Sequence, residues 1–126
     1  MPKVSKESAS KVSDFGVAED RTEEFEGYTV NFVSIHQDSD LAPMLRGLPD
    51  DRCQCPHWGY VFKGKVTVSY ADRVEVIAPG EAFYMTPGHT PAAVAGTEFV
   101  QFSPTDELAV SEAVMAKNMQ EMQGGQ

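Results

Sequence analysis

The sequence is poor in three features, and each shortage removes a class of protein. It has no apolar run of about 18 residues, so no transmembrane helix is expected. Only 10 Lys and Arg oppose 19 Asp and Glu, which gives a formal charge of -9. Nucleic acid and anionic membranes are therefore not expected as partners. The stretch from Met1 to Lys6 has no apolar signal core, so a cytoplasmic location is expected.

Cysteine is also scarce, because Cys53 and Cys55 are the only two in the chain. A disulfide-dense scaffold is thereby excluded, and in a reducing compartment such a pair indicates free thiols or metal ligands. A bond between the two is a poor fit on a strand. Residues i and i+2 there lie about 6.6 Å apart, near the upper limit for a disulfide.

What remains is a chain of 126 residues, 41% of them hydrophobic, which is enough for one domain with its own core. Residues 1–13 are rich in Ser and Lys and predict a flexible tail. Residues 14–104 form the expected globular unit, although 14–26 is acidic and predicts one short edge strand at most. After Pro104, a cap at Thr105 or Asp106 predicts a helix over 105–122.

One face of that helix carries residues at helical spacing, and these predict packing against the domain or a second subunit. They are Leu108, Ser111, Met115, Met119 and Met122.

Short β-rich segments separated by turn residues fill the middle of the chain. The predicted strands are 28–35, 57–62, 65–70, 74–77, 83–86, 92–95 and 98–102. The last two flank Gly96-Thr97 and predict a hairpin-like pair. Strands of this length with regular turn signals indicate an all-β sandwich or barrel.

Two stretches carry a more specific signal. The first is Cys53-Gln-Cys-Pro-His-Trp-Gly-Tyr-Val-Phe-Lys-Gly64, and the second joins Pro79-Gly-Glu81 to Thr86-Pro-Gly-His89. They resemble the two signature motifs of the cupin superfamily, and the resemblance covers roughly residues 50–103. It implies a small single-domain bacterial cupin with an RmlC-like jelly roll, also described as a double-stranded β-helix, followed by a short C-terminal helix.

The ligand positions of those motifs hold unusual residues. The family supplies three His and one Glu to a metal ion. Counted back from Gly64, the Glu position holds His57, and the two His positions fall on Asp51 and Cys53. The second motif's histidine position falls on Pro91, with His89 two residues before it. The standard ligand set is therefore absent, and a different one must be found if a metal binds.

The residues present offer such a set. Cys53, Cys55 and His57 share one parity on a regular strand, so they are expected to point to one face together. If the chain folds as a cupin, His89 points inward near the same mouth. Thiol and imidazole ligands favour a divalent ion, with Zn or Fe as the main candidates and Cu also possible.

The predicted ligands are Cys53, His57 and His89, with Cys55 or Asp51 as the fourth. Cys53 and His57 would lie about 13 Å apart on an extended strand, so joint coordination requires a bend at Pro56.

Three functions stay open at this point. The first is a metal-binding cupin that holds a small molecule and uses Lewis-acid or oxygen chemistry. The second is a metal-free, non-catalytic module that binds or senses a ligand, and the third is a purely structural dimer module. A homodimer is expected because Trp58, Tyr60 and Phe62 point outward and the helix carries a methionine face. Substrate, reaction and enzymatic character are left open by the sequence.

Overall fold

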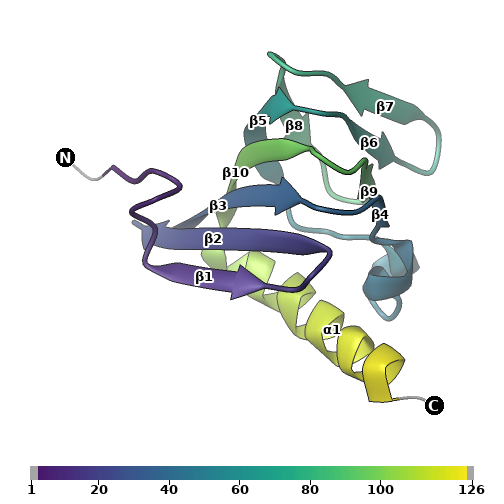
Figure 1. The fold of residues 1–126 in the computed structure, drawn as a ribbon. Helices are drawn as coiled ribbons and strands as arrows, with labels where there is room; N and C mark the ends of the chain where they lie inside the picture. The colour runs from purple at the N-terminus through teal and green to yellow at the C-terminus, as the bar shows by residue number, and fades with distance from the viewer. Residues whose placement is uncertain (1–2, 125–126) are drawn as a thin grey trace.

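The computed structural model describes residues 3–124, and within them ten strands build two antiparallel sheets, followed by one long helix (Figure 1). The larger sheet has the order β1 (Lys11–Asp14), β2 (Ala18–Phe25), β3 (Tyr28–Ile35), β10 (Glu98–Pro104), β5 (His57–Lys63) and β8 (Ala82–Met85). The smaller sheet has the order β4 (Ser39–Asp40), β9 (Thr90–Ala93), β6 (Val66–Ser69) and β7 (Val74–Ile77). The prediction of an all-β fold with a C-terminal helix is confirmed.

Alternation along β5 shows why these residues form a strand between two environments. His57 and Val61 are buried, whereas Trp58, Tyr60 and Phe62 are exposed. Successive side chains of a strand point to opposite faces, so the first set faces inward and the second faces outward. The predicted orientation of all five side chains is confirmed.

The main core lies between the two sheets. Its members are apolar side chains that face inward from strands of both: Val61, Val66, Val68, Tyr70, Ile77 and Met85, with Phe83, Ala93 and Phe99 packed against them. Burial of such side chains contributes about 1.5–3 kcal/mol each, so this cluster contributes substantially to stability.

A second core lies beneath α1 (Thr105–Gly124). It contains Leu45, Leu48, Cys53, Cys55 and Leu108, with Leu41, Val114 and Met115 against it. The leucines come largely from a segment that holds two short 3-10 helices, η1 (Ala42–Leu45) and η2 (Pro49–Asp51). The Asn118 side chain fastens α1 to this segment by donating to the carbonyls of Met44 (2.7 Å) and Arg46 (2.8 Å).

The predicted packing face of the helix is packed along only part of the helix. Leu108 and Ser111 are buried and Met115 packs on the second core. Met122 is exposed, and Val114 takes part in the packing instead.

The structure differs from the sequence-based expectation in three places. The stretch expected as tail contains the strand β1 from Lys11, and the acidic stretch after it contains an eight-residue strand, β2. Both pair in register, β1 with β2 and β2 with β3. The hairpin-like pair around Gly96-Thr97 is wrong, because β9 pairs with β4 and β6 in one sheet while β10 pairs with β3 and β5 in the other.

Gly64 occupies the turn that closes the first motif, and its environment explains the residue type. Its φ is +81°, a left-handed conformation that favours glycine. A Cβ atom there would also collide with Thr97, whose buried hydroxyl accepts from the Lys65 amide (3.1 Å). This contact joins the turn after β5 to the turn before β10.

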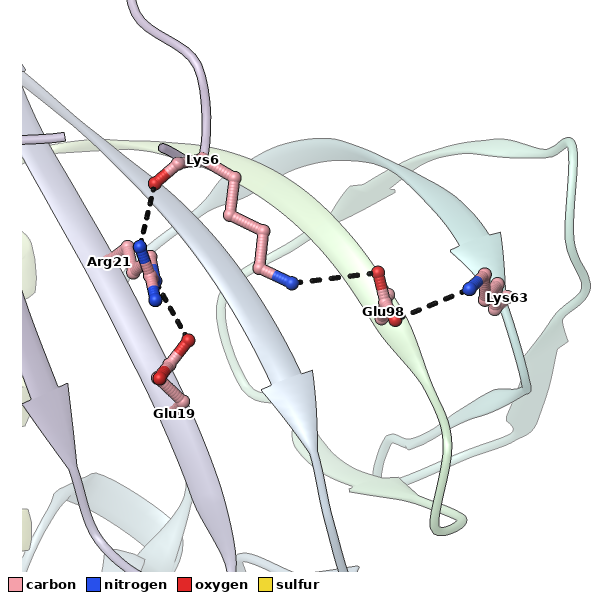
Figure 2. A network of polar contacts seen from close by, with 5 residues as sticks. All are labelled: Lys6, Glu19, Arg21, Lys63 and Glu98. Carbon is pink, nitrogen blue, oxygen red and sulfur yellow. Dashed lines mark hydrogen bonds and ion pairs between the residues drawn. The ribbon is translucent and has the colours of Figure 1, made fainter. Parts of the chain in front are cut away.

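The N-terminal segment is attached to the outer face of the larger sheet by charged contacts (Figure 2). The Lys6 ammonium lies 3.9 Å from the Glu98 carboxylate, which also lies 3.6 Å from the Lys63 ammonium. The Arg21 guanidinium pairs with Glu19 at 2.8 Å and donates to the Lys6 carbonyl at 3.4 Å. These contacts are partly exposed, so each contributes little on its own.

Candidate metal centre

Three of the predicted ligands converge at one buried point. The Cys53 sulfur and one ring nitrogen each from His57 and His89 lie within 4.8 Å of one another. The Cys53 Sγ lies 3.8 Å from His57 Nε2, and the two imidazole centroids are 4.9 Å apart. All three residues are nearly inaccessible, at 5%, 6% and 0% exposure for Cys53, His57 and His89.

The backbone explains how residues 53 and 89 come together. They form an isolated antiparallel bridge, in which the Cys53 amide donates to the His89 carbonyl (3.0 Å) and the His89 amide donates back (3.2 Å). Gly88 makes the turn at a φ of +94°, and its amide also donates to the Cys53 carbonyl (2.8 Å). The Pro-Gly turn of the second motif therefore positions His89 against the first motif.

The parity argument for the first motif is wrong in part. β5 begins at His57, and residues 54–56 are not in a strand. The chain bends between Cys53 and His57, so their side chains meet at 3.8 Å instead of the separation of an extended strand. The bend predicted at Pro56 lies one residue earlier, at Cys55, and it brings these two ligands together.

His89 presents a lone pair that has no partner. Its Nδ1 lies 2.6 Å from the Thr86 carbonyl, an acceptor, so Nδ1 carries the proton and donates. Nε2 is then an acceptor, and this buried atom has no hydrogen-bond partner among the residues described. Burying such an atom unpaired costs about 1–3 kcal/mol, so the site has a clear place for an electrophile.

His57 has a similar arrangement. Its Nδ1 lies 2.6 Å from the Ser103 hydroxyl, leaving Nε2 to face Cys53. Burial, reinforced by the neighbouring His89, lowers the pKa of His57 to about 3. Burial also lowers the pKa of His89. Both rings are therefore neutral at pH 7, which is the form that binds a metal.

The donor set fits a divalent transition metal. Zn–N bonds near 2.0 Å and Zn–S bonds near 2.3 Å place tetrahedral ligands roughly 3.3–3.6 Å apart. The observed 3.8 Å between Cys53 and His57 is close to this spacing, and a ring nitrogen of His89 lies within 4.8 Å of both other ligand atoms. Both imidazoles also have the Nδ1-to-oxygen hydrogen bond that orients metal-binding histidines.

The two candidates for a fourth ligand are not in this group. Cys55 is buried nearby, but its thiol lies 3.5 Å from the Pro56 carbonyl, and burial raises its pKa to about 12. Asp51 is exposed, and its carboxylate accepts from the Gly47 amide at 3.0 Å within the preceding turn. Both cysteines are free, as the sequence predicts.

Sequence reasoning missed two serines at the site. Ser103 contacts His57, and the Ser111 hydroxyl lies 3.3 Å from the Cys53 sulfur. Both are buried. Ser111 was part of the predicted packing face of α1, but no sequence signal connects position 111 with position 53.

A separate cavity of about 460 Å³ opens between β6, β7 and β8. Val68, Tyr70, Phe83 and Met85 are among its lining residues, and Glu75 and Glu81 add charge. None of the three converging ligands lines it. Met85 connects the two regions, because it lies opposite His57 in the β5–β8 register.

Comparison with known proteins establishes the fold class. No family model matches the chain, and no curated protein matches it by sequence. Solved structures do match, and they include an RmlC-like cupin from Shewanella frigidimarina (TM-score 0.51, 18% identity, 75% of this chain and 83% of that one). The fold of this protein is a cupin fold.

Two further structures cover more of the chain. A protein of unknown function from Rhizobium leguminosarum gives a TM-score of 0.61 at 20% identity, covering 82% of this chain and 95% of that one. The polyketide cyclase RemF from Streptomyces resistomycificus gives 0.58 at 16% identity, with 83% and 80% covered. At these identities the likeness defines the fold alone. Within residues 3–124, no helix is long and apolar enough to cross a membrane.

Proposed function

We propose that this protein is a small metal-binding cupin that holds a small molecule between its sheets. The observation that carries the proposal is the convergence of Cys53, His57 and His89 around the unpartnered Nε2 of His89. A Zn or Fe ion bound there would supply Lewis-acid or oxygen chemistry. The cavity beside Met85 is the proposed place for the small molecule.

Elemental analysis of untagged protein, purified without chelator, tests the metal site. We expect about one equivalent of metal per chain in the wild type. His57→Ala and His89→Ala should each lose most of the bound metal, because each removes one of the three ligands, which are two neutral imidazoles and one thiolate. His36→Ala is the matched control, since His36 is an exposed histidine. A wild-type protein without metal, and without response to added Zn, Fe, Ni or Mn, would contradict the proposal.

The second candidate is a metal-free, non-catalytic module that binds or senses a ligand. One observation favours it: the 460 Å³ cavity is lined by none of Cys53, His57 and His89. Thermal stabilisation by a compound library, with and without chelator, separates the two functions. Stabilisation that survives chelation supports the metal-free module, and stabilisation that disappears supports the metal-binding cupin.

We also propose a homodimer, formed through the outer face of the larger sheet. Five aromatic side chains there, the outer aromatic face, are each 40–50% exposed: Trp58, Tyr60, Phe62, Tyr84 and Phe102. Trp58 stacks on Tyr84 with centroids 4.8 Å apart and lies opposite Phe102 in the β5–β10 register. The five present on the order of 500 Å² of aromatic surface, the size of the apolar patches that mark functional surfaces.

A second copy of the chain is the proposed occupant of this face. A stable interface buries about 800 Å² per partner, so the patch supplies most of an apolar interface core. Trp58→Glu would place two like charges near a two-fold axis and should give a monomer by light scattering at micromolar concentration. Val110→Glu, on an exposed helix position, is the control. A monomeric wild type would contradict the dimer.

A cytoplasmic location remains a prediction of the sequence.

A further inference from the structure

Ser111 links α1 to the candidate metal centre. Only 3% of this residue is exposed, and its Oγ lies 3.3 Å from the Cys53 sulfur. It projects from the same helix face as Leu108 and Met115, which pack on the second core around Cys53. The helix therefore covers the site and places a hydroxyl against one of its ligand atoms.

The chemistry of the pair changes when a metal binds. Metal binding replaces the thiol proton of Cys53, which is released to solvent, and leaves a thiolate that can only accept hydrogen bonds. A hydroxyl is not among the usual ligands of Zn, but it is a good donor to a ligand atom. At 3.3 Å, the Ser111 hydroxyl is within reach to donate its O–H to that sulfur.

We propose that Ser111 is a positioning residue for the metal site: its hydroxyl donates to the metal-bound Cys53 thiolate, and so couples metal binding to the docking of α1. The proposal rests on the metal site proposed above. It assigns the C-terminal helix a part in that site, because the donor at one end of the bond belongs to the helix.

The remaining contacts of α1 explain why this bond matters. Its apolar contribution to the second core comes from Leu108, Val114 and Met115. Its other side-chain anchors are Asn118, about two turns beyond Ser111, and Thr105 at its first turn, whose hydroxyl lies 2.8 Å from that of Thr29. A charge-assisted hydrogen bond to a thiolate, formed only with metal present, would strengthen this attachment. By linkage, whatever strengthens helix docking also tightens metal binding.

Cobalt(II) titration provides a direct readout, because a cysteine thiolate bound to Co(II) gives a sulfur-to-metal charge-transfer band. Loss of the hydrogen bond raises the energy of the sulfur lone pairs. Ser111→Ala should therefore move the band to longer wavelength and weaken Co(II) binding by about 10- to 100-fold. Ser111→Thr keeps the hydroxyl and should retain the wild-type band.

Ser34→Ala is the matched control, since Ser34 is a buried serine on β3 with no contact to Cys53. Hydrogen exchange provides the second readout. Co(II) should slow amide exchange across α1 in the wild type and in Ser111→Thr, and slow it less in Ser111→Ala.

The outcomes separate the two proposals. If the wild type binds no Co(II), the proposed metal site and the proposed role of Ser111 are both refuted. If the wild type binds Co(II) and Ser111→Ala shows the same band, affinity and helix protection, only the role of Ser111 falls. A shifted band in Ser34→Ala as large as that in Ser111→Ala would also overturn it, because the effect would then be general.

Discussion

His57 and His89 each use Nδ1 for a hydrogen bond to an oxygen, and in His57 this leaves Nε2 facing Cys53. Because the oxygen partners Ser103 and Thr86 hold the rings at Nδ1, the orientation of both imidazoles is set before any ion arrives. Such preorganisation reduces the conformational cost of binding. Metal binding at the proposed site would therefore depend on these hydrogen bonds as well as on the ligands themselves.

Gly59 shows how tightly the inward face of β5 is packed. A Cβ at this position would collide with the Val100 carbonyl oxygen and the Phe83 ring. Gly59→Ala should lower the free energy of unfolding by about 3 kcal/mol, since the nearest obstacle is backbone that cannot move cheaply. Gly96→Ala, which has open space but a φ of +89°, should cost about 1 kcal/mol. Urea unfolding measures both, and equal losses would contradict the packing argument.

The Asp20 carboxyl should make the folding stability depend on pH. Burial raises its pKa above the ordinary value of 3.8, although the Asn31 amide donates to both carboxylate oxygens at 3.1 Å. Glu112 on α1 and Lys11 on β1 are the charged groups that act across this position. A raised folded pKa means that the native state binds the proton more tightly than the unfolded state. Stability is therefore lost as pH rises through the folded pKa.

Asp20→Asn removes this ionisation, so its stability relative to the wild type should improve as pH rises from about 4 to about 7. Chemical unfolding across that range measures the difference. Asp50→Asn removes the same charge from an exposed position and corrects for the change in net charge. A difference that shrinks as pH rises would show that the Asp20 carboxylate is stabilised in the folded protein.

At the scale of elements, α1 and the segment with η1 and η2 form one unit. The second core lies between them, and the unit covers the mouth where Cys53, His57 and His89 meet. Few apolar residues hold the helix, so its polar contacts carry a large share of the attachment. The docking of this cover over the site therefore depends on a small number of identified contacts.

Asn118→Ala tests this attachment, because it removes both hydrogen bonds to the Met44 and Arg46 carbonyls. The free energy of unfolding should fall by about 1–2 kcal/mol. Amide exchange should rise within α1 and remain unchanged in β5. Gln120→Ala, at an exposed position of the same helix, is the control. If both variants exchange alike, Asn118 does not hold the helix.

At the scale of the whole molecule, net charge and apolar surface have opposite effects on the proposed dimerisation. Each chain has a formal charge of -9, whereas the outer aromatic face has no charged member. The proposed association of two copies would therefore gain from aromatic burial and lose from repulsion between like-charged chains. The balance between these contributions depends on salt.

Raising the ionic strength from about 0.05 M to about 0.5 M should lower the Kd of the dimer, because screening weakens the repulsion. Sedimentation at several protein concentrations measures the change. Trp58→Glu should remain the weaker dimer at every salt concentration. A Kd that rises with salt would indicate an interface held by ion pairs, and would contradict the aromatic face as its core.

Much of the β-structure could be predicted from local pattern, and β7 matches its predicted bounds of 74–77. β2 was missed because its sequence, AEDRTEEF, is mostly charged. Its pairing with the strongly β-forming β3 overrides that low propensity. The hairpin across Gly96-Thr97 was wrong because a turn signal does not tell whether the chain stays in one sheet or crosses to the other.

The sequence by itself identified Cys53, His57 and His89 as candidate ligands and showed which side of β5 faces inward, because residue type and period-two alternation are local properties. Only the tertiary structure decided that Cys53 meets His57 through a bend, that His89 joins them through a backbone bridge, and that Ser111 covers them from α1. These contacts connect distant positions in the chain. They depend on the packing of whole elements, which no local pattern encodes.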